Sequence, residues 1–572
     1  MGIFIVGVVL VVFGAARRWI AVLNGAEPPA EAYARPSQPA TRSRWVAANR
    51  SWGGQSCLAI LPAAWIGCPT AAIINPMAQS EITRRVFVGA MTALGLSAAD
   101  DGWVELFDGR SLEGWRPSEN KSSWKVVEGQ LAAEGPRSHL FYTGPVHGAD
   151  FRNFELEVEV LTRPACNSGV YFHTAYQESG FPNKGFEIQI DNTFTGEGSY
   201  RERKKTGSLY GLRNIYKQFV PDDQWFKIHA AVRGKNVQIR LNGMLVVDYT
   251  EPVPPVIPDG PETGRFLDHG TFALQCHNDG SRARFRSVRV RPLADDAPTP
   301  GGPAPAADQV FRQIINQGRH NIPMADFHVH LKGGLTLEQA LAKSRRDGIE
   351  YGIAVNCGQA NTVQNDQEAI QFVESLKGQP CFVAMQAEGR EWTRRFSRGA
   401  AARFDYIFTD SMTWTDNRGK RMRLWMPDEV GAIADPQEFM DTLVERTVGI
   451  LDHEPVDIYV NPTFLPDAIA EDYEQLWTAE RRRKVIEAAV RNSVAIEINN
   501  RYKLPSPSFI RMAKEGGATF TFGTNDTGPD DLGRCEYGLR MVEECKLVWQ
   551  DFFVPLAGPK AIERKGEALR AG

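Results

Sequence analysis

A run rich in proline, alanine and glycine, residues 294–307, divides the chain into two regions with different hydrophobic patterns. Such a run cannot build a packed element, so it predicts a linker at 294–310. Before it, over residues 102–293, short alternating segments are separated by turn residues. Asn242-Gly243 between two of these segments is a strong signal for a two-residue hairpin. The first region is therefore predicted to be an all-β sandwich.

Beyond the linker, strand-like and helix-like segments alternate. The predicted strands are Met324–His330, Tyr351–Asn356, Phe382–Glu388, Asp405–Asp410, Asp457–Asn461, Val494–Ile498 and Thr519–Gly523. The predicted helices include Leu337–Arg346, Gln367–Leu376, Pro436–Leu451, Ala479–Val490 and Ser508–Lys514. Seven such strand–helix units predict a closed α/β barrel of (β/α)7 type over residues 311–560. A doubly wound open sheet is the alternative, and in either case the protein is multidomain.

Charge and cysteine content exclude some functions. The 65 Lys and Arg residues nearly balance the 69 Asp and Glu residues, so no overall field favours nucleic acid or an anionic membrane. We therefore expect no nucleic-acid partner. The eight cysteines show no paired short spacing, which argues against a zinc ribbon or a dense disulfide framework.

The segment 77–100 resembles a twin-arginine export signal. Its arginine pair, Arg84-Arg85, precedes a short apolar stretch and then small residues suited to cleavage. We expect an extracytoplasmic location, in the periplasm or secreted, without stable membrane association after cleavage. Because the signal should lie near a terminus, Met77 is the expected start and residues 1–76 an over-extended or disordered N-terminus. The alternatives are an amphipathic helix of a cytoplasmic protein and a membrane anchor at 3–16.

Three segments of the first region alternate between apolar and polar residues. In Gly185–Asp191 the apolar residues occupy one face of a strand and the polar residues the other. The segments 167–173 and 272–277 show the same pattern. The residues expected on the polar faces are Glu187, Gln189, Asp191, Tyr171, His173, Gln275 and His277. Together they predict a sugar-binding surface, with a merely hydrated sheet face as the alternative.

Five ordered motifs of this region resemble the 3-keto-disaccharide hydrolase domain family. They are Phe107–Trp115, Asn167–Phe172, Gly185–Asp191, Thr206–Tyr210 and Phe285–Leu293. The resemblance covers nearly all of residues 102–293. It implies a concanavalin-like jelly-roll sandwich that acts on glycosides already oxidised at C3. Other members of the family are lyases on the same ketosugars.

A C3 ketone acidifies the proton on C2, so cleavage can proceed by proton abstraction, elimination and hydration. This route needs one base, one acid and one donor to the enolate oxygen. The candidates are Glu187 or Asp191 as the base, His277 or His173 as the acid, and Tyr210 or Gln189 as the enolate donor. A conventional retaining glycosidase is the rival. Four strand residues separate Glu187 and Asp191 by about 13 Å, whereas retention needs carboxyl groups about 5–5.5 Å apart. An inverting pair remains an alternative.

The predicted barrel strands end in polar residues, and such ends converge at one mouth of a barrel. Asp326-Phe-His328-Val-His330 places two imidazoles on one side of a strand, where they can bind one divalent cation. The candidate ligands are His328, His330, Glu388, Asp410, Glu497 and Asp526. We expect a divalent ion there, zinc, manganese or iron. Helix capping by the same residue types is the alternative.

The second region resembles the PHP family of metallohydrolases over about residues 320–530. The matching segments are Asp326–His330, Ala495–Asn500 and Phe522–Asp526. The sequence departs from the family's pattern at Asn356-Cys357, Asn461-Pro462 and Thr527-Gly528. The resemblance therefore implies a metal-dependent hydrolase with one or two ions rather than three, and a barrel that only folds or binds is the alternative.

Taken together, the two regions predict an exported carbohydrate-active hydrolase that cleaves 3-keto-glycosides in its sandwich domain. A second hypothesis places the chemistry in the metal-dependent barrel and makes the sandwich a glycan-binding module. A third is a carbohydrate-binding protein without catalysis.

Overall fold

The computed structural model describes residues 101–257, 264–301, 304, 306–415 and 420–570. The predicted signal at 77–100, the expected start at Met77 and the apolar run at 3–16 lie outside these residues. Among the described residues, none of the helices combines the length and the apolar character needed to cross a membrane.

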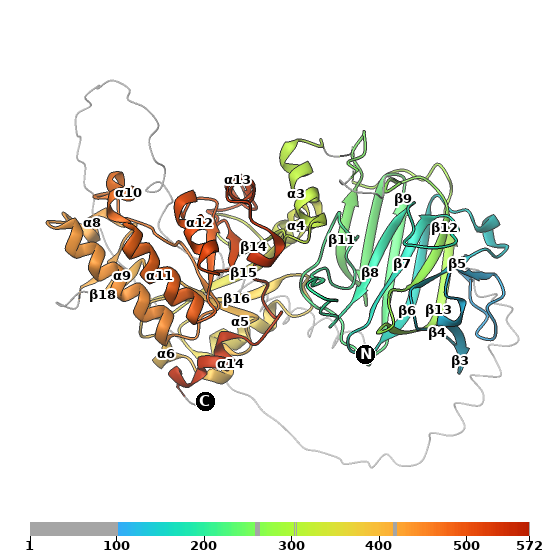
Figure 1. Ribbon diagram of the computed structural model, residues 1–572, viewed down its shortest axis with the longest axis horizontal. Helices are drawn as coiled ribbons and strands as arrows, with labels where there is room; N and C mark the ends of the chain where they lie inside the picture. The colour runs from blue at the N-terminus through green and yellow to red at the C-terminus, as the bar shows by residue number, and fades with distance from the viewer. Residues whose placement is uncertain (1–100, 258–263, 302–303, 305, 416–419, 571–572) are drawn as a thin grey trace, which may run out of the picture. The chain divides into compact units, whose positions relative to one another are not determined.

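The first region is a sandwich of two antiparallel sheets (Figure 1). The larger sheet has the order β11-β10-β9-β6-β13-β4-β3, with β1 paired to β13, and the smaller has the order β2-β5-β12-β7-β8. The strands are β1 Val104–Glu105, β2 Trp115–Pro117, β3 Trp124–Val127, β4 Gln130–Glu134, β5 Ser138–Tyr142, β6 Phe154–Thr162, β7 Asn167–Thr174, β8 Phe186–Asp191, β9 Phe226–Arg233, β10 Asn236–Leu241, β11 Met244–Thr250, β12 Thr271–Cys276 and β13 Arg282–Pro292. The predicted all-β sandwich is confirmed.

Strand β6 shows why these segments form a sandwich. Its alternate residues Leu156, Val158 and Val160 are at most 1% exposed and join the core between the sheets. The glutamates between them face outward and bond to arginines of β13, as Arg289 Nε does to Glu157 Oε2 at 2.8 Å. Burial on one face and cross-strand ion pairs on the other fix the register of a half-buried strand.

The predicted hairpin at Asn242-Gly243 joins β10 to β11. Asn242 has φ +48° and Gly243 has φ +90°, the left-handed values that a tight hairpin turn of this type requires. Asparagine and glycine adopt these values with little strain, so the turn is encoded locally.

The second region is a closed parallel barrel of seven strands, in the order β14-β15-β16-β17-β20-β21-β22 (Figure 1). Strand β14 pairs with both β15 and β22 and so closes the barrel. The barrel strands are β14 Ala325–His330, β15 Glu350–Cys357, β16 Phe382–Ala387, β17 Tyr406–Thr409, β20 Ile458–Tyr459, β21 Ala495–Asn499 and β22 Phe520–Gly523. A short hairpin of β18 Thr413–Thr415 and β19 Arg421–Arg423 lies outside it. The closed barrel is confirmed and the open doubly wound alternative is wrong.

Helices follow most of the barrel strands. They are α3 Gln309–Arg319, α4 Leu337–Asp347, α5 Asp366–Ser375, α6 Trp392–Arg395, α7 Arg398–Ala401, α8 Pro427–Val430, α9 Pro436–His453, α10 Tyr473–Leu476, α11 Ala479–Arg491, α12 Pro507–Glu515, α13 Glu536–Glu544 and α14 Ala561–Lys565. The start of α4 is set by a capping box in which Thr336 and Gln339 satisfy each other's backbone N–H groups.

Two apolar clusters hold the barrel together. One is built mainly from strand residues, among them Phe327, Phe382 and Tyr406, and the larger one includes the helices. This is the division expected between the inside of a closed barrel and the layer under its helices.

The linker prediction needs a correction at its end. Helix α3 starts at Gln309, because Asp308 accepts the backbone N–H of Phe311 at 2.8 Å and caps the helix. The beginning of the segment is also tied down, since Asn153 Nδ2 donates to the carbonyl oxygens of Ala294 and Asp295.

Candidate functional site

The polar face of the smaller sandwich sheet follows the predicted alternation of β8. Glu187 lies opposite Tyr171 on β7, and Gln189 lies opposite Gly169. The apolar residues between them belong to the sandwich core. The register of the pair β7–β8 is continuous from end to end, so no bulge changes the spacing of the polar residues.

Glu187 is held by two neighbouring side chains. The hydroxyl of Tyr171 donates to Glu187 Oε2 at 2.7 Å, and Gln275 Nε2 donates to Glu187 Oε1 at 3.1 Å. Gln275 Nε2 also bonds to the Tyr171 hydroxyl at 3.0 Å. All three side chains are buried. Such charge-assisted bonds fix the direction of the carboxylate.

A glycine makes room for this carboxylate. A Cβ atom at Gly169 would lie 2.6 Å from Glu187 Oε1, which is closer than a carbon and an oxygen tolerate. The carboxylate therefore occupies the space that a side chain at position 169 would fill.

His139 lies on the same face, opposite Gln275, and was not singled out from the sequence. Its ring is fully buried and packs edge-on against Tyr171, with 5.5 Å between ring centroids. Neither ring nitrogen has a hydrogen-bond partner among the residues that the structure describes. Burial lowers the pKa of His139 to about 3, so the imidazole is neutral at physiological pH. The alternation in Ser138–Tyr142 is the signal that could have found it.

His277 lies nearby, beside the ring of Phe181. The two ring centroids are 5.2 Å apart, and Phe181 also packs against His139 at 5.8 Å. His277 Nδ1 is buried without a partner. Burial lowers the pKa of His277, so the neutral ring predominates near pH 7 and the expected acid role would rest on a neutral N–H.

Asp191 is fully buried at the end of β8. Its Oδ1 accepts from Lys205 Nζ at 2.8 Å, while Oδ2 has no hydrogen-bond partner. Burial raises its pKa to about 7 although Lys205 opposes the rise. A carboxyl group that is partly protonated near neutral pH can supply a proton as well as accept one.

Gln189 and Tyr210 border Glu187 in different ways. In the orientation that satisfies both amide atoms, Gln189 donates to Glu187 Oε1 at 3.3 Å. The backbone N–H of Tyr210 donates to the Glu187 carbonyl at 2.9 Å, but its hydroxyl donates to Glu202 Oε2 at 3.0 Å. Burial holds the pKa of Tyr210 well above its usual value. The phenol is thus engaged by Glu202, which sequence reasoning missed.

The expected position of His173 is wrong. The residue has φ +54°, and the pairing of β7 with β12 shifts register beside it. The bulge turns the ring toward the core, where it packs on Phe154 and Phe172. Its Nε2 contacts the Arg152 carbonyl at 2.9 Å and Nδ1 accepts from the backbone of Asp268. The structure therefore separates His173 from Glu187, Gln189, Asp191 and His277.

At the mouth of the barrel the two histidines of β14 lie side by side, with 5.3 Å between ring centroids. His328 Nδ1 bonds to Glu497 Oε1 at 2.7 Å, and the backbone of His330 donates to Asp526 Oδ1 at 2.7 Å. His328 Nε2 and Asp526 Oδ2 are buried without partners.

Glu388 is surrounded by amides. Asn356 Nδ2 and Gln386 Nε2 both donate to its Oε1, at 3.2 and 2.8 Å. Burial and the neighbouring Asp410 raise the pKa of Glu388 to about 8. A carboxyl group in this setting is held largely in its neutral form near pH 7.

Asp410 and Glu497 are also bonded to amides. Asn461 Nδ2 donates to Asp410 Oδ2 at 3.1 Å, and Asn499 Nδ2 donates to Glu497 Oε2 at 3.0 Å. The Asn461 backbone N–H donates to the same Glu497 oxygen at 2.6 Å. These bonds fix the directions of the two carboxyl groups.

The six predicted ligands therefore reach one region at the carboxyl ends of the barrel strands. In the part of the chain that the structure describes, no three His, Cys, Asp or Glu side chains are arranged to hold an ion. The predicted divalent ion stays a prediction.

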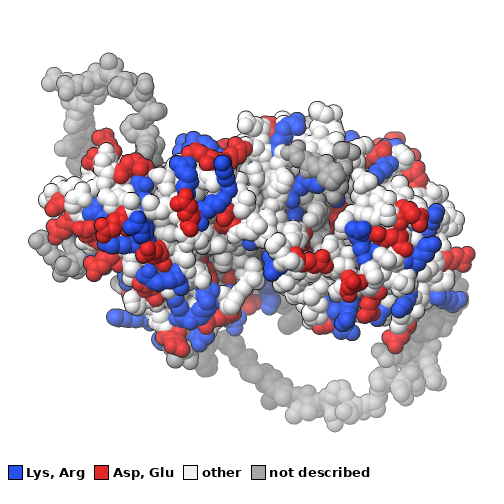
Figure 2. Space-filling model, viewed as in Figure 1, with Lys and Arg blue, Asp and Glu red and all other residues white. Residues whose placement is uncertain are grey.

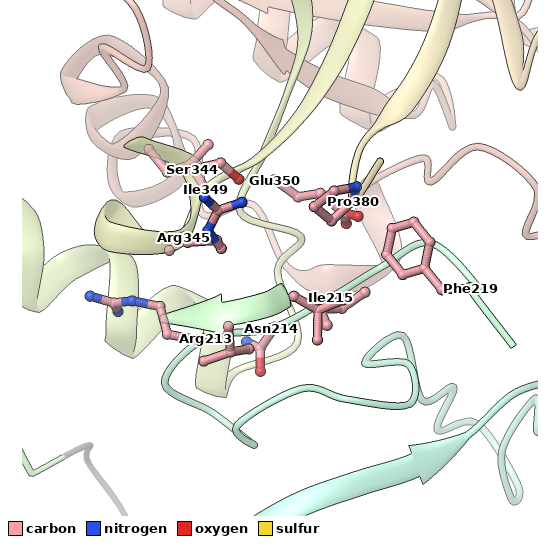
Figure 3. A pocket seen from close by; sticks show the side chains of 12 residues that line it. Arg213, Asn214, Ile215, Phe219, Ser344, Arg345, Ile349, Glu350 and Pro380 are labelled. Atoms are coloured by element: carbon pink, nitrogen blue, oxygen red, sulfur yellow. The ribbon is translucent and has the colours of Figure 1, made fainter. Parts of the chain in front are cut away.

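A small cavity is lined by none of the predicted site residues (Figure 3). Its lining includes Arg213 and Asn214 from a sandwich loop, and Ser344, Arg345 and Glu350 from the barrel. The cavity volume that is open to the centre of a water molecule is about 20 Å³, enough for roughly one water. This cavity is too small for a sugar.

On the face of the molecule in Figure 2, positive and negative side chains are interspersed.

Comparison with known proteins identifies the first region. Residues 102–291 match the family model described as a 3-keto-alpha-glucoside-1,2-lyase-like domain. A 3-keto-disaccharide hydrolase of Bacteroides thetaiotaomicron is 29% identical over 89 residues, or 14% of this chain and 31% of that protein. The match thus spans less than a third of the relative's length. The predicted 3-keto-disaccharide hydrolase-type domain is confirmed, and the PHP relation of the barrel stays a prediction.

Two solved structures are also similar. One is described as a candidate glycosyl hydrolase from Parabacteroides distasonis, with 19% identity, a TM-score of 0.28 and coverage of 34% of this chain and 94% of that chain. The other is a carbohydrate-binding module from Bacillus subtilis, with 14% identity, a TM-score of 0.21 and coverage of 31% and 94%.

Proposed function

We propose that the sandwich domain is a carbohydrate hydrolase that cleaves glycosides carrying a ketone at C3. The observation that supports this most is the surroundings of Glu187. A carboxylate oriented by Tyr171 and Gln275 shares a sheet face with several buried polar atoms that have no partner in the described part of the chain. These are both ring nitrogens of His139, Gln275 Oε1, His277 Nδ1 and Asp191 Oδ2. Buried polar atoms are seldom left unpaired in a folded protein unless a ligand or water completes them.

Glu187 is the proposed base. A ketone at C3 makes the C2 proton acidic, so the carboxylate removes it and the electron pair forms an enolate toward the C3 oxygen. Collapse of the enolate expels the glycosidic oxygen from C1 and leaves an enone. Addition of water across the C1–C2 double bond then completes net hydrolysis.

Asp191 is the better candidate for the acid. Its raised pKa of about 7 leaves it partly protonated at neutral pH, whereas His277 is mostly neutral there. For the enolate oxygen, the neutral imidazole of His139 and the Gln189 amide are the proposed hydrogen-bond donors, since the Tyr210 hydroxyl is already bonded to Glu202. Neutral donors of this kind stabilise developing negative charge without titrating themselves.

A retaining glycosidase built on the same carboxyl pair is disfavoured. Because β8 pairs regularly with β7 from Glu187 to Asp191, the strand keeps its normal rise. Their Cα atoms are then about 13 Å apart, against carboxyl groups about 5–5.5 Å apart in retaining enzymes.

The alternatives predict different mutant behaviour. If the barrel performs the chemistry, His328→Ala with His330→Ala abolishes turnover of a 3-keto disaccharide while Glu187→Gln does not. If the protein only binds glycans, no form turns over the substrate. Our proposal predicts that Glu187→Gln lowers kcat at least about 100-fold, because loss of a general base costs about 10²–10⁴. Unchanged circular dichroism and Tm would show that the variant is folded, and a Glu187→Gln variant with normal kcat would refute the proposal.

We also propose export through the twin-arginine-like segment. Replacing Arg84 and Arg85 by lysine in the full chain is expected to retain the protein in the cytoplasm. Equal periplasmic amounts of both forms would contradict this.

A further inference from the structure

One loop of the sandwich touches both the polar face and the barrel. We call residues 200–213 the strap. On one side the strap pairs with the free edge of β8: Gly207 N donates to the Gln189 carbonyl at 2.9 Å and Tyr210 N to the Glu187 carbonyl at 2.9 Å. The strap therefore forms the backbone boundary of the proposed site.

Within the strap, the Glu202 carboxylate accepts hydrogen bonds from several neighbouring side chains. Its Oε2 accepts from the hydroxyls of Tyr200 at 2.5 Å and Tyr210 at 3.0 Å. Its Oε1 accepts from Lys204 Nζ at 3.3 Å, and the side chains of Glu202 and Lys204 are 3% and 1% exposed. A buried carboxylate with several charge-assisted bonds holds its partners in one arrangement.

Asn321 of the barrel completes this network. Its Oδ1 accepts from Lys204 Nζ at 3.0 Å, and its Nδ2 donates to the carbonyl oxygen of Arg201. Asn321 is 3% exposed and has φ +66°, a left-handed conformation that costs energy for most residues but is tolerated by asparagine. The left-handed backbone just before β14 thus places the Asn321 side-chain amide where it bonds to both Lys204 and Arg201.

Other barrel residues support the strap from the same side. The rings of Tyr200 and Trp549 lie 6.2 Å apart, and the Arg203 guanidinium lies 5.5 Å from the Trp549 ring. Arg213 at the end of the strap donates to the carbonyl oxygen of Arg346 at 2.6 Å. The water-sized cavity of Figure 3 borders this contact, so the two surfaces pack closely around it.

We infer that Asn321 is a positioning residue for the sandwich site, acting through Lys204 and Glu202 on Tyr210 beside Glu187. This inference rests on the proposed function of the sandwich. The inference also gives the barrel a non-catalytic role, because Asn321 of the barrel supports the strap that borders the sandwich site.

Three variants of the full chain test the inference. Asn321→Gly keeps the left-handed backbone but removes the amide, and is expected to lower kcat/KM on a 3-keto disaccharide roughly tenfold, the loss typical of one hydrogen bond to a charged group. Asn321→Asp keeps an acceptor for Lys204 but loses the donor to the Arg201 carbonyl, so its loss of kcat/KM is expected to be smaller than that of Asn321→Gly. Lys217→Met is the control, because Lys217 forms a similar ion pair with Asp405 at 2.6 Å outside this network. It is expected to leave kcat/KM unchanged.

A second measurement does not depend on turnover. Hydrogen–deuterium exchange of the peptide covering 205–213 is expected to rise in Asn321→Gly, to rise less in Asn321→Asp, and to stay at the wild-type rate in Lys217→Met. If wild type turns over no 3-keto sugar, the proposed function fails while the exchange result still decides the inference. Unchanged exchange in Asn321→Gly would overturn it. Equal losses of kcat/KM in all three variants would also overturn it, because they would indicate a general loosening of the fold.

Discussion

The polar face of the sandwich and the mouth of the barrel are built from the same kinds of side chain, yet their hydrogen bonding differs. On the sheet face of Glu187, both ring nitrogens of His139, His277 Nδ1 and Asp191 Oδ2 have no hydrogen-bond partner among the described residues. At the barrel mouth, side-chain amides donate hydrogen bonds to Glu388 and Asp410. The buried polar atoms there that have no partner among the described residues are His328 Nε2, Gln386 Oε1 and Asp526 Oδ2. An oriented carboxylate amid unpaired polar groups is prepared for a ligand. At the barrel mouth, burial and the neighbouring Asp410 raise the pKa of Glu388 to about 8, which favours the neutral form of that carboxyl group.

The sharpest test of the sandwich side is Asp191→Asn. As the proposed acid, Asp191 must be protonated, and its pKa is raised to about 7. The wild-type kcat is therefore expected to fall as pH rises above about 7. The variant is expected to lose about 100-fold in kcat and to lack that limb of the pH profile. A variant that keeps the wild-type alkaline limb would remove Asp191 from the mechanism.

Gly169→Ala tests whether the direction of the Glu187 carboxylate matters. The added methyl group would lie 2.6 Å from Glu187 Oε1 and must push the side chain aside. We expect kcat to fall about tenfold, because small misplacements of a catalytic group cost up to about 100-fold. Gly243→Ala is a poor control because the φ of +90° at Gly243 would strain an alanine. The half-buried Gly449→Ala is better, because an added Cβ there meets no atom within 4 Å. Equal activity of Gly169→Ala and wild type would show that the contact is unimportant.

Sequence patterns gave the strands, the hairpin and the polar residues of β8, because alternation and turn residues act locally. They did not give the inward turn of His173, which a bulge produces, or the bonds from Glu202 to Tyr210 and from Lys205 to Asp191, which need the folded loop. In the barrel, the sequence showed which strands end in polar residues. It did not show that amides of neighbouring strands bond to those carboxylates, since such pairings depend on the closure of the sheet.

A smaller effect concerns Glu350, whose Oε2 accepts from the backbone of Tyr216 at 2.7 Å. Burial raises the pKa of Glu350 to about 8, from 4.5 in the unfolded chain. The folded state thus binds a proton that the unfolded state has released, so stability falls as pH rises from about 4.5 to about 8. Glu350→Gln is expected to reduce this fall and to raise Tm by a few degrees at pH 8.5 relative to wild type. The exposed control Glu338→Gln is expected to keep the wild-type dependence of Tm on pH. The same unchanged dependence in Glu350→Gln would contradict the prediction.

The smallest expected effect is that of metal removal. If the barrel mouth takes no part in sandwich chemistry, dialysis against a chelator and the double change His328→Ala with His330→Ala leave kcat on a 3-keto disaccharide within about twofold. Metal analysis of the purified protein accompanies the assay. Stoichiometric metal together with complete loss of activity on chelation would contradict this expectation and would assign the chemistry to the barrel instead of the sandwich.

Deuterium exchange at C2 tests the central claim most directly. When a 3-keto disaccharide is incubated with the protein in D₂O, removal of the C2 proton by Glu187 predicts deuterium at C2 of the released ketosugar. Glu187→Gln should not incorporate it. Cleavage by wild type with the original C2 proton fully retained would contradict the account.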